Sequence, residues 1–288
     1  MPEHSDTWHA AGDFLGDYYN YLKKMATGES ETSVSTGLKD LDNMLMYGLE
    51  PQDLIILAGR PSMGKTCLAM NIARHAAINT NIPVAYFSLE LGPMGFLQRL
   101  LMSMTKIHVT KFSLLHTLSQ MDWDALKEHA GNLQHAPLYL DMTSVLTPED
   151  IFKRVSTLAG KVQLGLVVID SLQLLQIETT YDSIKDACGT LKTLAVEFNV
   201  PVLLLSQLSD EIDDRTSKVP MLSDLRFAGA IEKSADVIVF LSRDEAYNLD
   251  TEDKGIADII VAKHKRAPAG MVRVNWVPEY ATFADLGS

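Results

Sequence analysis

Short runs of consecutive apolar residues recur along the chain after residue 50. Longer segments with an apolar residue every three or four positions separate them. The short runs are typical of strands covered on both faces of a parallel sheet, and the longer segments are typical of helices that bury one side. The predicted strands are Leu54–Ala58, Val84–Leu89, Leu138–Leu140, Leu166–Ile169, Val202–Leu205 and Val237–Leu241.

Helices are predicted between these strands. Apolar stripes at helical spacing define Pro93–Thr105, Trp123–Leu133 and Ile184–Phe198. A further helix is predicted to begin after Thr147, which is followed by proline at the first helical position and by Asp150 at the third. A hydroxyl and a carboxylate at these positions accept hydrogen bonds from N–H groups at the start of a helix.

The pattern changes after Gly255. Two extended runs, Ile256–Lys265 and Met271–Val277, flank the segment Ala267–Gly270, which contains proline and glycine. Two strands separated by such a turn are typical of a β-hairpin. The expected fold is therefore an α/β core with a mostly parallel sheet, helices on its faces and a C-terminal β-hairpin.

The first fifty residues have a pattern of their own. Between Ala10 and Met25 the apolar residues fall at helical spacing, which predicts one amphipathic helix. The polar stretch Thr27–Ser35 is typical of a linker. We therefore expect two parts, residues 1–34 with helix and linker and residues 35–288 with the α/β domain. The helix can pack on its own domain or on a neighbouring subunit, and the sequence leaves both open.

The composition is that of an ordinary globular protein: 288 residues, 47% hydrophobic and 22% charged. No apolar stretch approaches the roughly 20 residues of a membrane helix. The N-terminus lacks the features of a signal peptide, so a cytoplasmic protein is expected. With two cysteines, Cys67 and Cys188, a four-cysteine zinc ribbon is excluded and no disulfide framework is indicated.

The formal net charge is −12 and the pI is near 5.1. Such a chain is not expected to bind nucleic acid over its whole surface, because that affinity depends on Lys and Arg. A local basic strip is compatible with the balance, and Lys263-His-Lys-Arg266 is one. On charge alone, a solvated strand end is the simpler interpretation of this strip.

The most specific pattern is Gly59-Arg-Pro-Ser-Met-Gly-Lys-Thr66, which matches the phosphate-loop pattern G-x-x-x-x-G-K-[ST] at every required position. A predicted strand precedes it and a helical segment, Cys67–Ala77, follows, which is the context that the motif requires. We expect Lys65 to reach the β- and γ-phosphates and the Thr66 hydroxyl to ligate Mg²⁺. The residues expected to surround the nucleotide are Gly59, Ser62, Met63, Gly64, Lys65, Thr66 and Cys67. The chain is therefore expected to bind a nucleoside triphosphate, with a chance glycine-rich turn as the alternative.

Polar residues follow three of the predicted strands. Asp170 is expected in the Mg²⁺ shell opposite Thr66. Glu90 stands where a carboxylate beside the phosphate loop can orient or deprotonate the attacking water. Gln207 stands where an amide can sense the γ-phosphate by hydrogen bonding. The alternative is that the two acids cap helices or lie in solvated turns.

A series of short motifs runs along the chain in a fixed order. These motifs are Gly59–Thr66, Phe87-Ser-Leu-Glu90, Ile169-Asp-Ser-Leu-Gln173, Ser206-Gln-Leu208, Ser223-Asp-Leu-Arg226, Gly229-Ala-Ile-Glu232, Ala235-Asp236 and Arg243-Asp-Glu245, preceded by the lead-in Ser35-Thr-Gly-Leu-Lys-Asp-Leu-Asp42. In this order they resemble the C-terminal ATPase domain of DnaB-type replicative helicases, over roughly residues 35–285. Several motifs in a family's order are far more specific than a phosphate loop alone.

The resemblance implies a RecA-like P-loop NTPase core that forms a homohexameric ring around single-stranded DNA, with ATP at subunit interfaces. It also implies 5′→3′ travel, unwinding of duplex DNA during replication, and a primase and a helicase loader as partners. Lys65 and Thr66 match the phosphate-binding lysine and the magnesium-ligating hydroxyl. Glu90 matches the catalytic glutamate, Asp170 an aspartate at or beside the metal, and Gln207 the residue that couples the γ-phosphate to the DNA loops.

Other positions are implied to contact DNA. Arg226 and Gly229 fall where the family's central loop contacts the DNA backbone, so binding should be salt-dependent and largely indifferent to sequence. Phe227 stands where the family usually has an acid, and an aromatic ring there can stack on bases or pack in the ring interface. Without the resemblance, Arg226 would be interpreted as one half of a surface ion pair.

The family also supplies an arginine finger from the neighbouring subunit, on the strand that carries the basic strip. Here Lys263 and Lys265 occupy that register, and Arg266 comes one place later. The two lysines share a face of a strand, whereas Arg266 points the other way unless the strand bends or bulges. Lys265 is therefore the expected finger and Arg266 the alternative.

The sequence leaves several interpretations of domain organisation and function open. The family carries a globular N-terminal domain ahead of its linker helix, whereas only Ala10–Met25 precedes the linker here. The chain is thus either an excised domain or a compact relative. A RecA- or RadA-type recombination ATPase has the same fold, although RadA's zinc ribbon is absent. A non-motor ATP-binding assembly subunit and a small-molecule phosphotransferase also remain compatible with the phosphate loop.

Overall fold

A computed structural model of the chain describes residues 10–26, 33–248 and 250–287. It divides into two compact units, residues 1–33 and residues 34–288, which are described in turn. Within the described ranges, no helix is both long enough and apolar enough to cross a membrane.

The first unit contains the predicted N-terminal helix. A short 3-10 turn, η1 (Ala11–Phe14), leads into helix α1 (Leu15–Ala26). Leu15, Tyr18 and Leu22 are exposed, as expected for the apolar side of an amphipathic helix that needs a partner surface. Most of the predicted linker, residues 27–32, lies outside the described residues.

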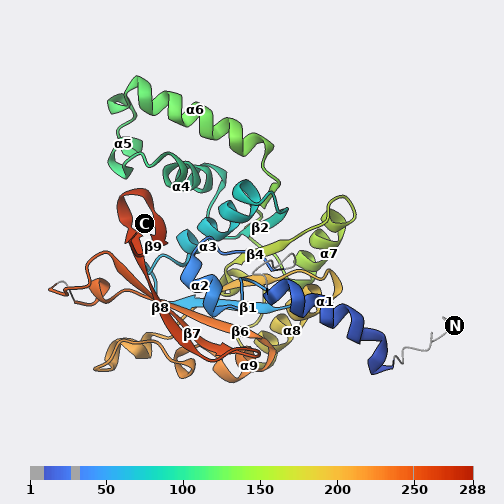
Figure 1. The fold of residues 1–288 in the computed structure, drawn as a ribbon. Helices are drawn as coiled ribbons and strands as arrows, with labels where there is room; N and C mark the ends of the chain where they lie inside the picture. Colours follow the sequence, from blue (N-terminus) through green and yellow to red (C-terminus); the bar gives the residue numbers. More distant parts are fainter. Residues whose placement is uncertain (1–9, 27–32, 249, 288) are drawn as a thin grey trace. The chain divides into compact units, whose positions relative to one another are not determined.

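The second unit is built on a sheet whose strands, in the part of the chain that is described, follow the order β3-β2-β4-β5-β1-β6-β7-β8-β9 (Figure 1). The first six strands in this order run parallel to their neighbours. They are β1 (Leu54–Gly59), β2 (Val84–Ser88), β3 (Leu138–Asp141), β4 (Leu166–Asp170), β5 (Val202–Gln207) and β6 (Val237–Ser242). All six lie where the apolar runs predicted them.

Three antiparallel strands extend the sheet beyond β6. The predicted hairpin is confirmed as β7 (Ile256–His264) and β8 (Gly270–Val277). The last strand, β9 (Thr282–Asp285), pairs with β8 and was not predicted. It is four residues long and only one of them, Phe283, is buried, so the sequence carries no clear strand pattern there.

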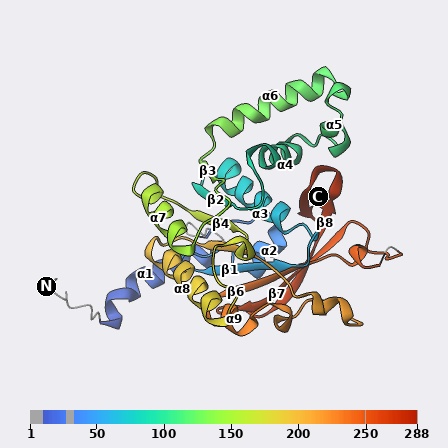
Figure 2. The ribbon, with the colours of Figure 1, turned by 180° about the vertical axis from the view of Figure 1, so that it is seen from behind.

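Helices cover both faces of the sheet, as the continuous apolar strands predict. On β1, Ile55 and Leu57 pack toward one face, and Leu54 and Ile56 pack toward the other. The first face is covered by α2 (Lys39–Met44), α3 (Lys65–Arg74) and α4 (Pro93–Thr105). In Figure 1, α2 and α3 lie in front of the sheet and α4 lies above it. The second is covered by α7 (Pro148–Ala159), α8 (Tyr181–Glu197) and α9 (Ala228–Ser234), which come forward in Figure 2.

Local sequence signals set several of these helices. α4 has the predicted bounds, and α6 (Gln120–His135) contains the predicted segment, with α5 (Val109–Ser113) between them. At the start of α7, the Thr147 hydroxyl accepts a hydrogen bond from the Asp150 N–H at 3.1 Å. The Asp150 carboxylate accepts one from the Thr147 N–H at 3.1 Å, which completes the predicted cap.

The strand register brings the candidate site residues to one edge of the sheet. Gly59 at the end of β1 lies opposite Gln207 at the end of β5, and Ser88 at the end of β2 lies opposite Asp170 at the end of β4. In open α/β sheets, ligands bind in the crevice outside the carboxyl ends of the strands. A ligand-binding site is therefore expected at this edge of the sheet.

Candidate functional site

The phosphate loop is shaped by the two glycines of its motif. Gly64 precedes α3 with a φ of +100°, and a Cβ there would lie 2.9 Å from the Phe283 ring. A Cβ at Gly59 would lie 2.7 Å from the carbonyl oxygen of Leu241. Among the described residues, no side chain caps the N-terminus of α3. Its first N–H groups therefore face the loop and are suited to an anion.

Lys65 begins α3 and is held by the loop itself. Its Nζ donates to the carbonyl oxygens of Gly59 at 2.8 Å and of Arg60 at 2.9 Å. Burial lowers the pKa of Lys65 to about 8, although the carboxylates of Asp170 and Glu90 act in the opposite direction. The ammonium group thus loses its proton at a lower pH than an ordinary lysine does, and a bound phosphate would stabilise its charge.

Asp170 lies buried at the end of β4, opposite the start of α3. The hydroxyl of Tyr86 lies 3.4 Å from its carboxylate. Burial raises the pKa of Asp170 above its usual range and the Glu90 carboxylate adds to this, while hydrogen bonds from Thr66 and Tyr86 lower it. A partner of opposite charge would therefore be favourable here.

The pairing of Thr66 with Asp170 fits Mg²⁺, which prefers oxygen ligands and is usually held through one or two carboxylates plus phosphate oxygens. Among the described residues, no group of three or more His, Cys, Asp or Glu could hold a metal ion. Mg²⁺ held by Thr66 and Asp170 would take phosphate oxygens of a nucleotide as further ligands.

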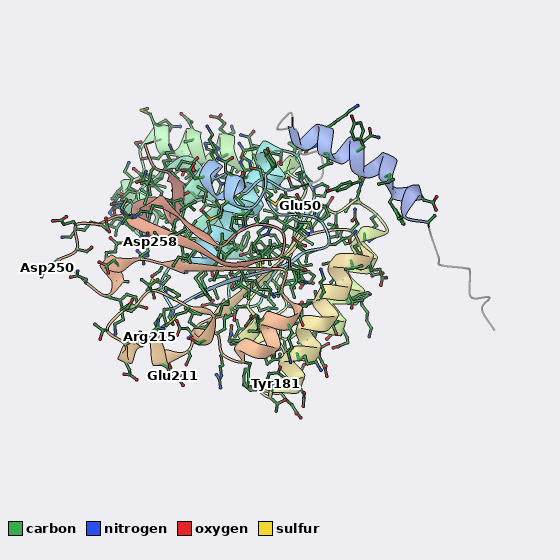
Figure 3. All side chains as sticks on the ribbon, turned by 60° about the horizontal axis from the view of Figure 1, so that its bottom comes forward. Glu50, Tyr181, Glu211, Arg215, Asp250 and Asp258 are labelled. Atoms are coloured by element: carbon green, nitrogen blue, oxygen red, sulfur yellow. The ribbon has the colours of Figure 1, made fainter. Side chains whose placement is uncertain are left out.

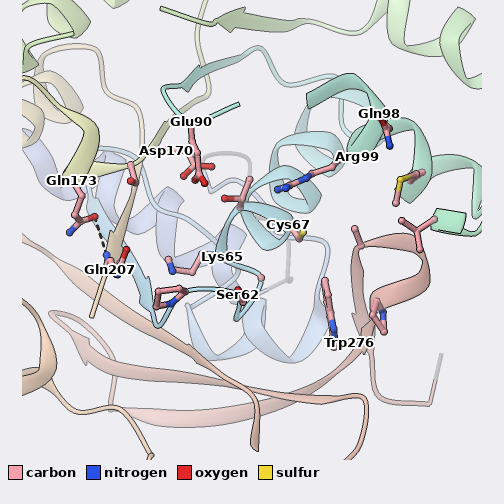
Figure 4. Close-up of a pocket in the computed structure, with 18 residues that line it drawn as sticks. Ser62, Lys65, Cys67, Glu90, Gln98, Arg99, Asp170, Gln173, Gln207 and Trp276 are labelled. Atoms are coloured by element: carbon pink, nitrogen blue, oxygen red, sulfur yellow. Dashed lines mark hydrogen bonds between the residues drawn. The ribbon is translucent and has the colours of Figure 1, made fainter. Parts of the chain in front are cut away.

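These groups line one cleft of about 560 Å³, within the range of small-molecule sites. Figure 4 shows Lys65, Glu90 and Asp170 directed into the same space, with Gln207 beside them. Ser62, Gly64, Thr66 and Cys67 also line it. The structure thus brings together Glu90, Asp170 and Gln207 with five residues of the phosphate loop and the start of α3. Two predicted residues are not part of the lining: Gly59 does not reach the cleft surface, and Met63 is buried in the core.

The further lining residues that were not predicted as site residues include four with large polar, charged or aromatic side chains: Gln98, Arg99, Gln173 and Trp276. Gln98 and Arg99 come from α4, which was predicted only as a helix with an apolar stripe. Gln173 lies within a predicted motif, but its type alone assigned it no role. For Gln98, Arg99 and Trp276, no signal in the sequence relates the residue to the phosphate loop, because the packing of distant segments brings them to it.

Trp276 on β8 forms the wall of the cleft opposite the acids (Figure 4). Its ring packs against Phe283, with ring centroids 4.6 Å apart, and the Arg243 guanidinium lies 5.0 Å from its centroid. Arg243 also donates to the carbonyl oxygen of Ser62 at 2.6 Å and pairs with Glu245 at 2.7 Å. The C-terminal strands therefore support the phosphate loop and offer it an aromatic surface.

The basic strip at the end of β7 lies at the opposite edge of the sheet. His264 pairs with Val237, the first residue of β6, whereas the phosphate loop follows the carboxyl ends of the parallel strands. The pairing is irregular between Ile238 and Val239, and β7 ends at His264. The irregularity therefore falls at Ala262, before the three basic residues, and Lys265 and Arg266 lie beyond the end of the strand.

The basic side chains of this strip contact groups of their own chain. Lys263 donates to the carbonyl oxygens of Glu232 and Ala235, the latter at 2.8 Å. Lys265 pairs with Asp236 at 2.6 Å, and Arg266 pairs with Asp53. A single chain thus does not bring Lys263, Lys265 or Arg266 to its own nucleotide cleft.

The positions matched to a DNA loop lie on the side of the sheet that α8 and α9 cover. Arg226 is exposed and its guanidinium lies 5.7 Å from the centroid of the Phe227 ring. Phe227 has a φ of +62° and directly precedes α9 as its N-cap residue. Gly229 packs beside Tyr181 at the start of α8, which Figure 3 labels: a Cβ at Gly229 would lie 3.6 Å from that ring.

A lysine and two aromatic residues lie near Arg226 and Gly229. Lys233 lies 5.9 Å from the centroid of the Tyr181 ring, on the following turn of α9. Arg226 and Phe227 also line a small cavity of about 90 Å³ with residues from the segment after β4. No ion pair of the Arg226 side chain occurs among the described residues, so the surface ion pair considered from sequence is not seen.

Known proteins resemble this chain in sequence and in fold. Replicative DNA helicase DnaB of Geobacillus stearothermophilus is 38% identical over 290 residues, which cover 99% of this chain and 63% of that protein. A solved ATPase domain superposes with a TM-score of 0.90 at 31% identity, covering 97% of this chain and 99% of that one. A DnaB-like replicative helicase, solved in a study of its interactions with primase, gives a TM-score of 0.87 at 30% identity, covering 98% and 68%.

The chain spans less than two thirds of the length of the curated DnaB relative it matches. The family model for the DnaB-like helicase C-terminal domain matches residues 33–285, which contain the whole sheet and every residue of the cleft. The agreement of family, fold and site geometry makes the chain a member of the DnaB-like helicase C-terminal domain family.

Proposed function

We propose that this chain is the ATP-hydrolysing motor of a replicative DNA helicase, which moves along single-stranded DNA and unwinds the duplex. The observation that carries the proposal is the cleft in which Lys65, Thr66, Glu90 and Asp170 converge on one phosphate loop. The membership of the chain in the DnaB-like family supports the choice of DNA as the track.

In this proposal the residues of the cleft divide the work of phosphoryl transfer. The loop N–H groups and Lys65 bind and orient the phosphates of ATP. Thr66 and Asp170 hold Mg²⁺, which would neutralise charge on the phosphate oxygens. Glu90, exposed at the mouth of the cleft, orients the attacking water and accepts its proton. Gln207 contacts the γ-phosphate and couples its binding to the position of the DNA-contacting segment.

A homohexameric ring completes the site. The basic strip lies far from the cleft of its own chain, at the opposite edge of the sheet, so a cation from it would reach a nucleotide only in a neighbouring subunit. Lys265 is the preferred finger, with Arg266 as the alternative and Lys263 as a supporting cation. Since Lys265 and Arg266 pair with Asp236 and Asp53, assembly would exchange these contacts for the phosphate.

The DNA track is assigned to Arg226, Phe227 and Gly229. An exposed guanidinium beside an aromatic ring suits a nucleic-acid strand, because the cation binds phosphate and the ring stacks on a base. Travel in the 5′→3′ direction and contacts with a primase and a helicase loader follow from the family rather than from this geometry. The helix α1 is assigned to contact with a neighbouring subunit.

The test is ATP turnover by the full chain with and without oligo-dT. Turnover that rises on adding single-stranded DNA supports the motor. Nucleotide binding with negligible turnover under both conditions supports a non-motor assembly subunit instead. Turnover that DNA leaves unchanged, with phosphate passing to an added small-molecule acceptor, supports a phosphotransferase. A second assay separates the motor from a recombination ATPase: displacement of a strand from a forked duplex supports the motor, and exchange of a single strand into a homologous duplex without such displacement supports a recombination ATPase.

A further inference from the structure

Gln173 lies between the nucleotide cleft and the surface assigned to DNA. It belongs to the short 3-10 turn η4 (Leu172–Leu174), directly after Asp170 at the end of β4. Of the described residues that line the nucleotide cleft and the small cavity beside Arg226 and Phe227, Gln173 is the one that lines both. Its side chain is therefore a physical connection between the two places.

The oxygen and the nitrogen of the Gln173 side-chain amide both form hydrogen bonds with residues of β5. The side-chain Oε1 accepts a hydrogen bond from the backbone N–H of Gln207 at 3.0 Å, which Figure 4 draws as a dashed line. The Nε2 donates to the hydroxyl of Ser206 at 3.1 Å. Since an amide is planar, these two bonds fix the orientation of the Gln173 side chain relative to the end of β5.

This arrangement links two movements. Gln207 is the residue proposed to contact the γ-phosphate, so a change in its position on ATP binding is transmitted to Gln173 through the backbone N–H. The cavity that Gln173 lines is small, about 90 Å³, and Phe227 and Arg226 form part of its wall. Because Gln173 forms this wall together with Phe227 and Arg226, a displacement of Gln173 changes the cavity that the three residues share.

We propose that Gln173 is the positioning residue that couples the nucleotide cleft to the Arg226–Phe227 segment, an inference that rests on the proposed function. Gln173 does not act on the reacting atoms. It holds the end of β5 and the DNA-contacting segment in mutually dependent positions. Nucleotide in the cleft then changes the affinity for DNA, and DNA changes the affinity for nucleotide by the same factor.

The experiment measures this coupling by binding and not by turnover. The dissociation constant of fluorescent oligo-dT is determined for the full chain with a non-hydrolysable ATP analogue and with ADP, and the ratio of the two is the coupling factor. The variant is Gln173→Met, which keeps the length of the side chain and removes both hydrogen bonds. The matched control is Gln176→Met on the same segment, because Gln176 is exposed and its side chain makes no hydrogen bond to another described residue.

In the wild type the coupling factor should be at least about tenfold, within the usual range of allosteric coupling. Gln173→Met should bring it to within about twofold of unity, whereas Gln176→Met should retain the wild-type value. A melting temperature equal to that of the wild type, measured by circular dichroism, verifies that Gln173→Met is folded. If Gln173→Met is unfolded, the coupling factor is measured on Gln173→Glu instead. The Glu carboxylate still accepts a hydrogen bond from the Gln207 N–H, so the coupling factor should stay close to the wild-type value.

Two failures are distinguishable. A wild type that binds DNA with equal affinity in both nucleotide states overturns the inference and the motor proposal together. If the wild type shows a coupling factor well above unity and Gln173→Met shows the same factor, the inference alone is overturned. If Gln173→Met is unfolded, a folded Gln173→Glu whose coupling factor is near unity has the same meaning. Equal loss in Gln176→Met also contradicts it, because the effect would then be unrelated to the two hydrogen bonds.

Discussion

At the scale of single residues, the cleft separates binding from hydrolysis. Lys65 supplies a positive charge to the phosphates, so Lys65→Ala should weaken nucleotide binding itself. Glu90→Gln keeps the shape but cannot accept a proton, so it should bind ATP with near-normal affinity and hydrolyse it about 10²–10⁴-fold more slowly. Calorimetric binding and steady-state turnover distinguish the two effects. Near-normal turnover in Glu90→Gln would remove Glu90 from its role and require another base.

The buried lysine also predicts a pH dependence. Below pH 8 Lys65 is protonated with and without nucleotide, so the affinity should be flat. Above pH 8 the free protein loses this proton, and binding must recover it, because the phosphates stabilise the charged form. Affinity should then fall by up to about tenfold per pH unit. Lys65→Arg, which stays charged throughout, should show no such fall, and an equal fall in that variant would assign the effect to another group.

At the scale of elements, the end of β7 is predicted to act on a neighbouring subunit. Lys265→Ala should reduce turnover on the order of 10³-fold, as removal of a transition-state cation does in related enzymes. When variant subunits are mixed into wild-type protein, turnover should fall more steeply than the variant fraction, because each one disables its neighbour's site. The same series with Arg266→Ala tests the alternative finger.

Lys265 also pairs with Asp236, so a structural effect needs its own control. Lys192 pairs with the same carboxylate at 2.7 Å but lies on α8, outside the strip. Lys192→Ala should therefore reproduce any effect on folding, but in mixed assemblies turnover should fall only in proportion to the fraction of this variant. Turnover that falls only in proportion to the fraction of both Lys265→Ala and Arg266→Ala would argue against a trans-acting residue on this strand.

The elements also mark what the sequence could predict. Strands such as Leu54–Gly59 and the capped helix after Thr147 follow from local patterns, and so does the phosphate loop, because its glycines are dictated by backbone geometry. Trp276 and Phe283 have no such local signal. Their place against Gly64 depends on the pairing of β8 with β9 and of β7 with β6, which are contacts between distant segments.

At the scale of the whole molecule, assembly is predicted to depend on α1. Leu15 and Leu22 are exposed on this helix, and burying them on a neighbouring subunit would be favourable. Deleting residues 1–30 should shift the protein from hexamers toward monomers while the second unit stays folded. Leu15→Ser with Leu22→Ser in the full chain should have the same direction of effect. Unchanged size in analytical ultracentrifugation would mean that the helix packs within its own subunit.

The proposed motor requires a ring, because the basic strip and the nucleotide cleft lie at opposite edges of one sheet. Electron microscopy of the full chain with a non-hydrolysable ATP analogue and oligo-dT tests this most directly. We expect six-membered rings with nucleotide between subunits, the end of β7 facing the neighbour's phosphates, and the DNA strand passing Arg226 in the centre. Monomers, or rings with DNA bound on the outer surface, would contradict it.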